Sequence, residues 1–258
     1  EARNTAPGGL YFFGLFLAFF VPKFLIGTFL LTEDLVRIIW GISRQFVAQP
    51  ETFLPGRRRF VSNVAMITAA LPFGALLYGM FRGKYQYQVL TYTLTFDDLP
   101  EAFDGYTIAH ISDIHCGSFD DDEKVAYGIS LVNEQNADLI LFTGDLVNNR
   151  ADELDRWQGV LGNLTAPDGV YSVLGNHDYG DYVPWASAEE KAANLNDLKG
   201  RQAKMGWQLL LNEHITIKRD DQELKLIGVE NWGKGGFKKS GDFQAATQGI
   251  DPESFKIL

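Results

Sequence analysis

The 258-residue chain is acidic overall, but its charges are unevenly distributed. Its formal net charge is -10, and hydrophobic residues make up 46% of the composition, which is enough to build a folded core. Residues 1–84 carry 9 Lys and Arg against 4 Asp and Glu, whereas residues 85–258 carry 14 against 29. The acidic second part argues against a nucleic-acid surface, which needs clustered basic residues. The single cysteine excludes an intramolecular disulfide.

Two long apolar runs lie in the first 84 residues. Residues 10–31 contain one charge, Lys23, and residues 60–81 contain none. Each run is long enough to cross ~30 Å of hydrocarbon at ~1.5 Å per residue. We therefore predict a membrane region over residues 1–84 with two transmembrane helices, the first of them broken at Pro22 and Lys23. The alternative is a pair of buried helices packed on the following domain.

The segment between the two runs is predicted to be amphipathic and to lie in the cytoplasm. Its apolar residues recur at helical spacing, as in an interfacial or a packed helix: Leu35, Ile38, Ile39, Ile42 and Phe46. Five Lys and Arg lie between the spans, whereas only Arg82 and Lys84 follow them. Such a bias keeps residues 32–59 in the cytoplasm and places residues 85–258 on the outer side of a bacterial inner membrane. A cytoplasmic domain is the alternative, if the first run does not span.

Three arginines, Arg57 to Arg59, directly precede the second apolar run. The stretch "RRRFV" resembles a twin-arginine export signal, although it is internal rather than N-terminal. The alternative is that these arginines act only as topology determinants.

Beyond residue 84 the pattern changes to alternating strands and helices. Residues 89–96 alternate with period two, and further strands and helices are expected in the order strand 107–112, helix 123–136 capped by Asp120 to Asp122, strand 138–143, helix 152–164 and strand 170–174. This βαβαβ order predicts an α/β fold with parallel strands and right-handed crossovers.

Polar residues follow each of the last three strands. Asp113 and His115 follow the first, Asp145 the second, and Asn176 and His177 the third. Because the carboxyl ends of parallel strands meet at one edge, these clusters should converge where α/β sheets bind ligands. Any one of them alone is more often a cap or a turn.

Carboxylate, amide and imidazole groups together suit borderline metals such as Mn, Fe or Zn rather than Ca. Asp145, midway between the other clusters, could bridge two ions. A two-metal site clamps the attacking and departing oxygens of an in-line displacement at phosphorus. His177 would then stabilise charge or protonate the leaving group.

The stretches "SDIH", "TGDLV" and "LGNHD" resemble the first three signature blocks of the calcineurin-like metallophosphoesterase superfamily in order and spacing. The resemblance covers about residues 107–258, and the membrane-anchored start is similar to the bacterial branch near the YkuE-like and YaeI-like phosphodiesterases. It implies a calcineurin-like β-sandwich flanked by helices, with two divalent ions. Asp113, His115 and Asp145 would hold one ion, Asp145 and Asn176 the other, and His177 would act on the transition state. Asp178 would lie behind these ligands.

Two blocks of the superfamily are missing: a later metal-binding His and a G-H-x-H block. Residues 253–258 resemble the strand that leads to the first of them, and the chain starts with Glu1 rather than Met. We therefore expect residues 85–258 to be a C-terminally incomplete metallophosphoesterase domain holding about half of the ligands.

The remaining candidate residues are predicted to be structural. His110 alternates within a strand and is expected in the core, and His214 is expected to enter a later strand. Cys116 is interpreted as a neighbour of the site rather than a ligand. The glycine-rich stretch 231–237 is expected to be a mobile loop, with a substrate-contacting lid as the less favoured hypothesis.

Two classes of function fit this sequence. The favoured one is a membrane-anchored phosphodiesterase, for which the anchor favours a lipid-linked phosphodiester over nucleotides or other substrates. The alternative is a domain of the same fold that binds or scaffolds without turnover.

Overall fold

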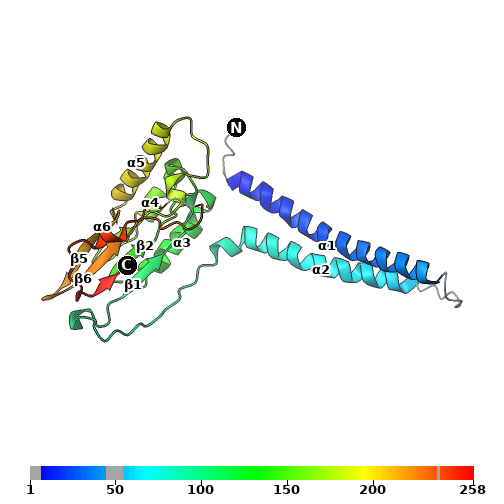
Figure 1. The fold of residues 1–258 in the computed structure, drawn as a ribbon, viewed down its shortest axis with the longest axis horizontal. Coiled ribbons are helices and arrows are strands. Elements are labelled where there is room, and N and C mark those ends of the chain that lie inside the picture. Colours follow the sequence, from blue (N-terminus) through cyan, green and yellow to red (C-terminus); the bar gives the residue numbers. More distant parts are fainter. Residues whose placement is uncertain (1–6, 45–54, 237–238) are drawn as a thin grey trace. The chain divides into compact units, whose positions relative to one another are not determined.

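Two long helices form the first part of the chain in the computed structural model, which describes residues 7–44, 55–236 and 239–258 (Figure 1). Helix α1 covers Pro7–Arg44 and α2 covers Pro55–Phe81. They pair through aromatic contacts such as Tyr11 with Phe81, whose ring centroids lie 5.6 Å apart. The chain divides into two units, Gly8–Gln86 and Tyr87–Leu258, and each is described by itself.

Helix α1 is continuous, so the predicted break at Pro22 is wrong. Proline removes one backbone donor, and a helix of 38 residues retains its other hydrogen bonds on both sides. The helical conformation predicted for residues 35–42 is confirmed, and these residues form the last turns of α1. Phe46 lies outside the described residues.

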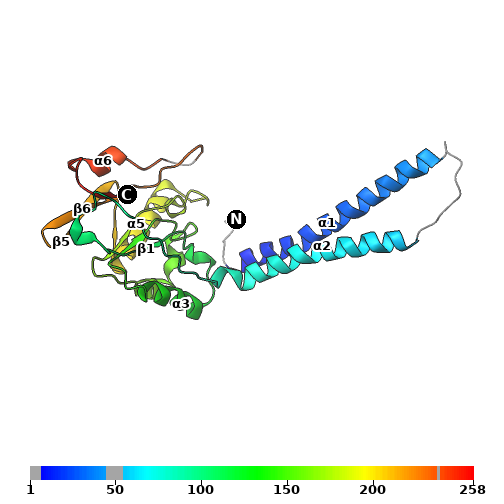
Figure 2. The same ribbon diagram turned by 90° about the horizontal axis from the view of Figure 1, so that it is seen from below.

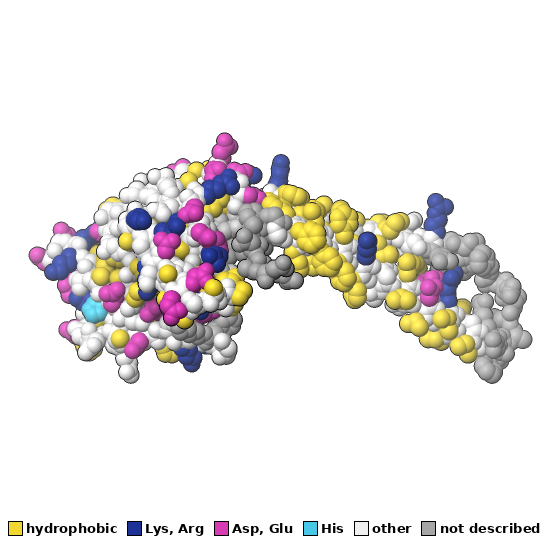
Figure 3. Space-filling model, turned by 90° about the horizontal axis from the view of Figure 1, so that it is seen from above, with side chains coloured by type: hydrophobic (Ala, Val, Ile, Leu, Met, Phe, Trp, Pro, Cys, Tyr) yellow, Lys and Arg dark blue, Asp and Glu magenta, His cyan; other side chains and the backbone are white. Residues whose placement is uncertain are grey.

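The helical unit exposes its apolar side chains. Two stretches, Tyr11–Ser43 and Arg59–Phe81, are long and apolar enough to cross a membrane, and only 11% of each one's most apolar window is buried. Hydrophobic side chains cover much of this unit's visible face in Figure 3, whereas charged side chains gather on the other unit. Within the described residues, this unit therefore has the exposed apolar surface expected of a membrane region.

A four-stranded parallel sheet, in the order β1-β2-β3-β4, organises the second unit (Figure 2). Its strands are β1 Ile108–Ile111, β2 Leu139–Phe142, β3 Val170–Ser172 and β4 Trp207–Leu209. Helices α3 Asp122–Asn133, α4 Gln158–Leu161 and α5 Ala188–Lys204 make the crossovers. Asp121 caps α3 by accepting from the backbone N–H of Lys124. The predicted parallel βαβαβ order is confirmed.

A second sheet of three strands, β5-β6-β7, packs on the face of the first sheet opposite the helices. Its strands are β5 Glu213–Arg219, β6 Gln222–Gly228 and β7 Lys256–Ile257. The two sheets share one apolar core, formed by Phe103, Leu139, Tyr171, Leu210, Ile217, Leu224 and Leu226. The expected β-sandwich flanked by helices is therefore present.

Short helices also occur in the segments between these elements: η1 Gly83–Tyr85, η2 Glu101–Phe103, η3 Cys116–Ser118, η4 Ala151–Leu154, η5 His177–Tyr179 and α6 Phe243–Thr247. The single helix predicted over residues 152–164 is wrong, because η4 and α4 occupy this stretch as two short pieces. Arg156 lies between them and pairs with Asp122 of α3 at 2.6 Å.

The strand predicted over residues 89–96 is also wrong. The alternating residues are assigned to no strand, and their apolar side chains are exposed: Val89, Leu90, Tyr92, Leu94 and Phe96. A strand needs a ladder partner, and none is present within the described part of the chain. The Phe96 ring packs on Phe255 beside β7, with centroids 5.4 Å apart.

Candidate metal centre

The loops that follow β1 and β2 are joined by backbone hydrogen bonds beyond the ends of the strands. The N–H of Asp113 donates to the carbonyl of Gly144 at 3.0 Å, and the N–H of His115 donates to the carbonyl of Asp145 at 2.9 Å. These bonds bring the "SDIH" and "TGDLV" stretches together, as the register of the strands predicts.

Glycines let the second and third loops approach each other. A Cβ atom on Gly144 would lie 2.2 Å from the backbone nitrogen of Gly175, and a Cβ on Gly175 would lie 2.2 Å from the Oδ1 atom of Asp145. Gly144 also has a φ of 97°. A side chain at either position would separate the loops that carry Asp145 and Asn176.

Three candidate ligands adopt a left-handed backbone conformation. Asp113, His115 and Asp145 have φ values of 54°, 45° and 58°. This conformation costs of order 1–3 kcal/mol for such residues and is concentrated at functional sites. Here it occurs at three residues that directly follow the carboxyl ends of β1 and β2.

The ligand atoms of His115, Asp145 and His177 lie within 4.8 Å of one another. The Nε2 atom of His115 is 3.7 Å from Oδ2 of Asp145 and 3.9 Å from Oδ1 of Asp113, too far for hydrogen bonds. Two atoms bound to one ion at ~2.1 Å each lie roughly 3–4 Å apart. The 3.7 and 3.9 Å spacings of His115 to Asp145 and Asp113, together with the mixed oxygen and nitrogen donors, therefore fit a divalent ion.

Asp113 and Asn176 lie at the rim of this group. The Asp113 side chain is 66% exposed and accepts a 2.5 Å hydrogen bond from the hydroxyl of Ser112. Asn176 lies directly before η5, where its side-chain nitrogen donates to the Tyr182 hydroxyl at 2.7 Å. Both residues reach the edge of the sheet to which sequence reasoning assigned them.

The His177 ring is held in one tautomer. Its Nδ1 lies 2.7 Å from the carbonyl oxygen of Asn148, and because a carbonyl only accepts, Nδ1 carries the proton. The other ring nitrogen, Nε2, is then available to a metal or to a substrate oxygen. The ring stacks edge-on against His115, with centroids 4.7 Å apart.

The Asp178 carboxylate joins the loop after β2 to the loop after β3. It is fully buried and accepts hydrogen bonds from the backbone N–H groups of Asp145, Leu146, Val147 and Gly175. Burial raises the pKa of its carboxyl to about 7, and the backbone donors limit this rise. Its contact with the Asp145 backbone matches the expectation that Asp178 lies behind the ligands.

Sequence reasoning missed a second supporting carboxylate, Glu153. It accepts hydrogen bonds from the backbone N–H groups of Asn148, Asn149 and Arg150, at 2.6, 3.0 and 3.0 Å. It therefore fixes the loop whose carbonyl holds His177. An acidic residue in the first turn of a helix is too common a signal to have identified it.

The other candidates have structural roles, with one correction. His110 is exposed rather than in the core, because β1 is at the edge of its sheet; its Nε2 lies 2.9 Å from the Thr143 hydroxyl. His214 is confirmed as structural, with Nδ1 2.8 Å from the carbonyl of Ala246. Cys116 is buried, and burial raises the pKa of its thiol well above the ordinary value.

The glycine-rich stretch 231–237 lies largely within the described residues and is linked to the edge of the sheet. Tyr179 of η5 donates a 2.7 Å hydrogen bond to Glu230, directly before this stretch. Residues 237–238 lie outside the described part, so the lid hypothesis stays a prediction.

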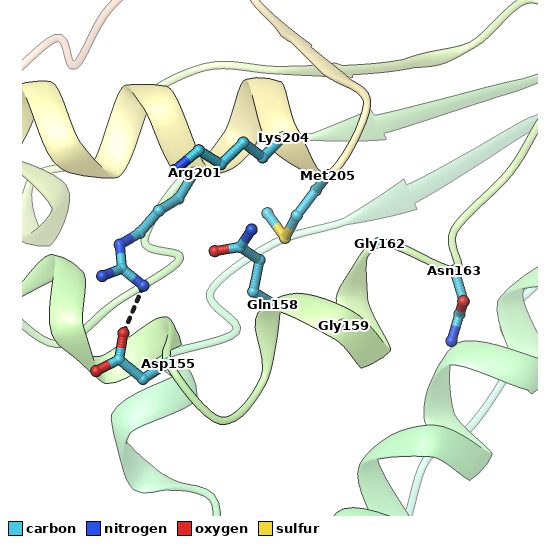
Figure 4. A pocket seen from close by; sticks show the side chains of 8 residues that line it. All are labelled: Asp155, Gln158, Gly159, Gly162, Asn163, Arg201, Lys204 and Met205. Carbon is cyan, nitrogen blue, oxygen red and sulfur yellow. Dashed lines mark hydrogen bonds and ion pairs between the residues drawn. The ribbon is translucent and has the colours of Figure 1, made fainter.

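A pocket of about 390 Å³ lies away from this centre, between α4 and the end of α5 (Figure 4). Arg201 crosses it to pair with Asp155 at 2.7 Å, and Lys204 and Met205 line the wall that comes from α5. Both helices end near the amino edge of the sheet, and none of the candidate ligands lines the pocket. It is therefore separate from the candidate metal centre.

Comparison with known protein families agrees with this geometry. The family model described as "Calcineurin-like phosphoesterase" matches residues 106–238. The chain belongs to this family. A second model, described as "Probable Calcineurin-like phosphoesterase, transmembrane domain", matches residues 2–84. The calcineurin-like phosphoesterase domain thus follows a transmembrane region, and members of the family use divalent metal ions.

Several proteins similar to this chain have the word metallophosphoesterase in their names. The Bacillus subtilis (strain 168) protein "Uncharacterized metallophosphoesterase YkuE" is 34% identical over 49% of this chain and 46% of its own length. The Danio rerio "Transmembrane protein with metallophosphoesterase domain" is 32% identical over 70% of this chain and 39% of its own. "Uncharacterized metallophosphoesterase YkoQ" of Bacillus subtilis (strain 168) is 26% identical over 72% and 66%. The chain thus aligns with less than two thirds of the length of each relative.

Proposed function

We propose that this protein is a membrane-anchored phosphodiesterase with a dinuclear metal centre. The observation that carries the proposal is the convergence of His115, Asp145 and His177, whose ligand atoms lie within 4.8 Å of one another at the end of three parallel strands. Asp113 and Asn176 complete the predicted set at its rim. The alternative of a scaffold without turnover gives no reason to hold these three side chains at this spacing.

Each residue has a proposed role. Asp113, His115 and Asp145 would hold one ion, and Asp145 and Asn176 the other. Two bound ions supply charge stabilisation to both oxygens of an in-line displacement and activate water as the nucleophile. The Asp145 carboxylate is fixed in orientation, because Oδ1 accepts from the backbone N–H of His177 at 2.8 Å, and Oδ2 lies 3.7 Å from Nε2 of His115, where it would serve as a ligand. His177 keeps its Nδ1 proton on the carbonyl of Asn148; in the imidazolium form Nε2 carries a second proton, which it would donate to the leaving oxygen.

The direct test is Asp145→Asn in the complete gene product. We expect loss of turnover of a model phosphodiester together with loss of bound manganese, because one substitution weakens both ion sites. Asp155→Asn is the control, since Asp155 is exposed and pairs with Arg201 at the distant pocket. Full activity and full metal content in Asp145→Asn would contradict the proposal.

We further propose that the domain lies outside the bacterial inner membrane and acts on a lipid-linked phosphodiester. Five Lys and Arg lie between the two apolar runs, in residues 32–59, and this bias favours a cytoplasmic position for that segment. An anchor of two apolar helices keeps the domain beside lipid-linked substrates.

Protease added to intact spheroplasts tests the sidedness. Digestion of residues 87–258 without lysis is the expected result. Protection of this unit until the cells are lysed would reverse the proposed orientation. A soluble cytoplasmic protein, which the protease reaches only after lysis, serves as the internal control for protease activity.

A further inference from the structure

Tyr182 lies beside the candidate metal centre, in the loop between η5 and α5, and it contacts two of the centre's residues. Its hydroxyl oxygen is 2.7 Å from the side-chain nitrogen of Asn176. Its ring centroid is 4.5 Å from that of His177, with an angle of 40° between the planes. The side chain is 46% exposed, so it is placed at the surface of the site rather than in the core.

The contact with Asn176 matters because the two ends of a side-chain amide differ chemically. The oxygen can bind a divalent ion, whereas the nitrogen carries two hydrogens and repels it. A rotation of 180° about the last bond exchanges the two ends. Because Nδ2 of Asn176 donates to Tyr182, Oδ1 faces away from the phenol and stays available as a ligand.

We propose that Tyr182 is a positioning residue that holds the Asn176 amide with its oxygen available to the metal ion. The inference rests on the proposed function, since it requires an ion at Asn176. It adds a residue outside the three signature stretches. The Tyr182 ring also packs against His177 and thereby restricts the orientation of the imidazole.

Manganese binding tests this role without reference to turnover. Mn²⁺ is titrated into the metal-free complete gene product, and electron paramagnetic resonance distinguishes free ions, single bound ions and spin-coupled pairs. In Tyr182→Phe the ring is kept and the acceptor is lost. We expect the affinity for one of the two ions to fall about 10- to 100-fold, with loss of the coupled-pair signal and retention of the other ion. Tyr127→Phe on α3 is the control, because Tyr127 is exposed to a similar extent, and it should bind both ions normally.

A second background separates orientation from packing. In Asn176→Asp both ends of the side chain are oxygens, so its orientation no longer matters. Adding Tyr182→Phe to Asn176→Asp should therefore change the affinity by less than about threefold. An equally large loss of manganese affinity in both backgrounds, or no loss in either, overturns the inference about Tyr182. The proposed function still stands in that case if the unmodified protein binds two ions. Fewer than two ions in the unmodified protein overturns both.

Discussion

Glu153 is expected to support both the stability of the domain and the position of His177. Its carboxylate accepts three backbone hydrogen bonds from residues 148–150, and the carbonyl of Asn148 then accepts from the imidazole of His177. In Glu153→Ala all three donors lose their acceptor. Hydrogen bonds to charged groups contribute ~1.5–3 kcal/mol each, but water can replace part of the loss in this half-buried loop. We therefore expect the free energy of unfolding to fall by about 2–4 kcal/mol.

Calorimetry and kinetics on detergent-solubilised protein measure the two effects. For a unit of this size, ~1 kcal/mol corresponds to roughly 2–4 °C, so the transition of residues 87–258 should fall by roughly 5–15 °C. Phosphodiester turnover below that transition should fall by ~10- to 100-fold, as for other residues that orient a functional side chain. Glu153→Gln retains one acceptor oxygen and should lie between the two proteins.

The matched control is Asp152→Ala. Asp152 is the neighbouring carboxylate, is 60% exposed and pairs with Arg150 at 3.5 Å. An exposed pair of this kind contributes at most ~1 kcal/mol, so the transition should move by no more than a few degrees. Equal effects of Glu153→Ala and Asp152→Ala would refute the reasoning, because the three backbone bonds would then carry no stability.

Two further predictions concern a catalytic role and a pH dependence. His177→Ala should retain bound manganese while turnover slows by ~10²–10⁴-fold, the usual range for a lost proton transfer; loss of metal would instead make His177 a ligand. Although burial opposes it, hydrogen bonds from the backbone N–H of Thr107 and from Arg219 lower the pKa of Asp138 below its ordinary 3.8. A lowered pKa contributes stability that is fully present when the pH is above the ordinary pKa of 3.8, and this stability is lost as the pH falls through the lower pKa of the folded state. Asp138→Asn should therefore lower the unfolding free energy by about 1–2 kcal/mol at pH 7, and the unfolding free energies of variant and unmodified protein, measured by urea titration, should begin to approach each other near pH ~3.8 and converge below the folded pKa. A gap that persists at low pH would contradict the charge argument.

The errors in sequence reasoning have specific physical causes. Residues 89–96 have a strand's alternation, but strand formation depends on a partner supplied by distant residues, and the alternation does not reveal whether one is there. His110 has the spacing of a core residue, yet β1 is at an edge, and sheet order is not readable from one strand. Pro22 is a valid local signal for a break, but the length of α1 overrides it.

Motif spacing in the chain was enough to predict the family, the parallel order of the strands and the edge of the sheet at which the candidate residues lie: Asp113, His115, Asp145, Asn176 and His177. It could do so because a parallel sheet repeats one unit and brings every strand end to the same edge. The contacts that support these side chains became visible only in the folded chain. Glu153, Tyr182 and the buried Asp178 act through contacts with backbone atoms and amide groups of other loops. Such contacts depend on how far apart the folded loops lie, and no spacing along the chain records that distance.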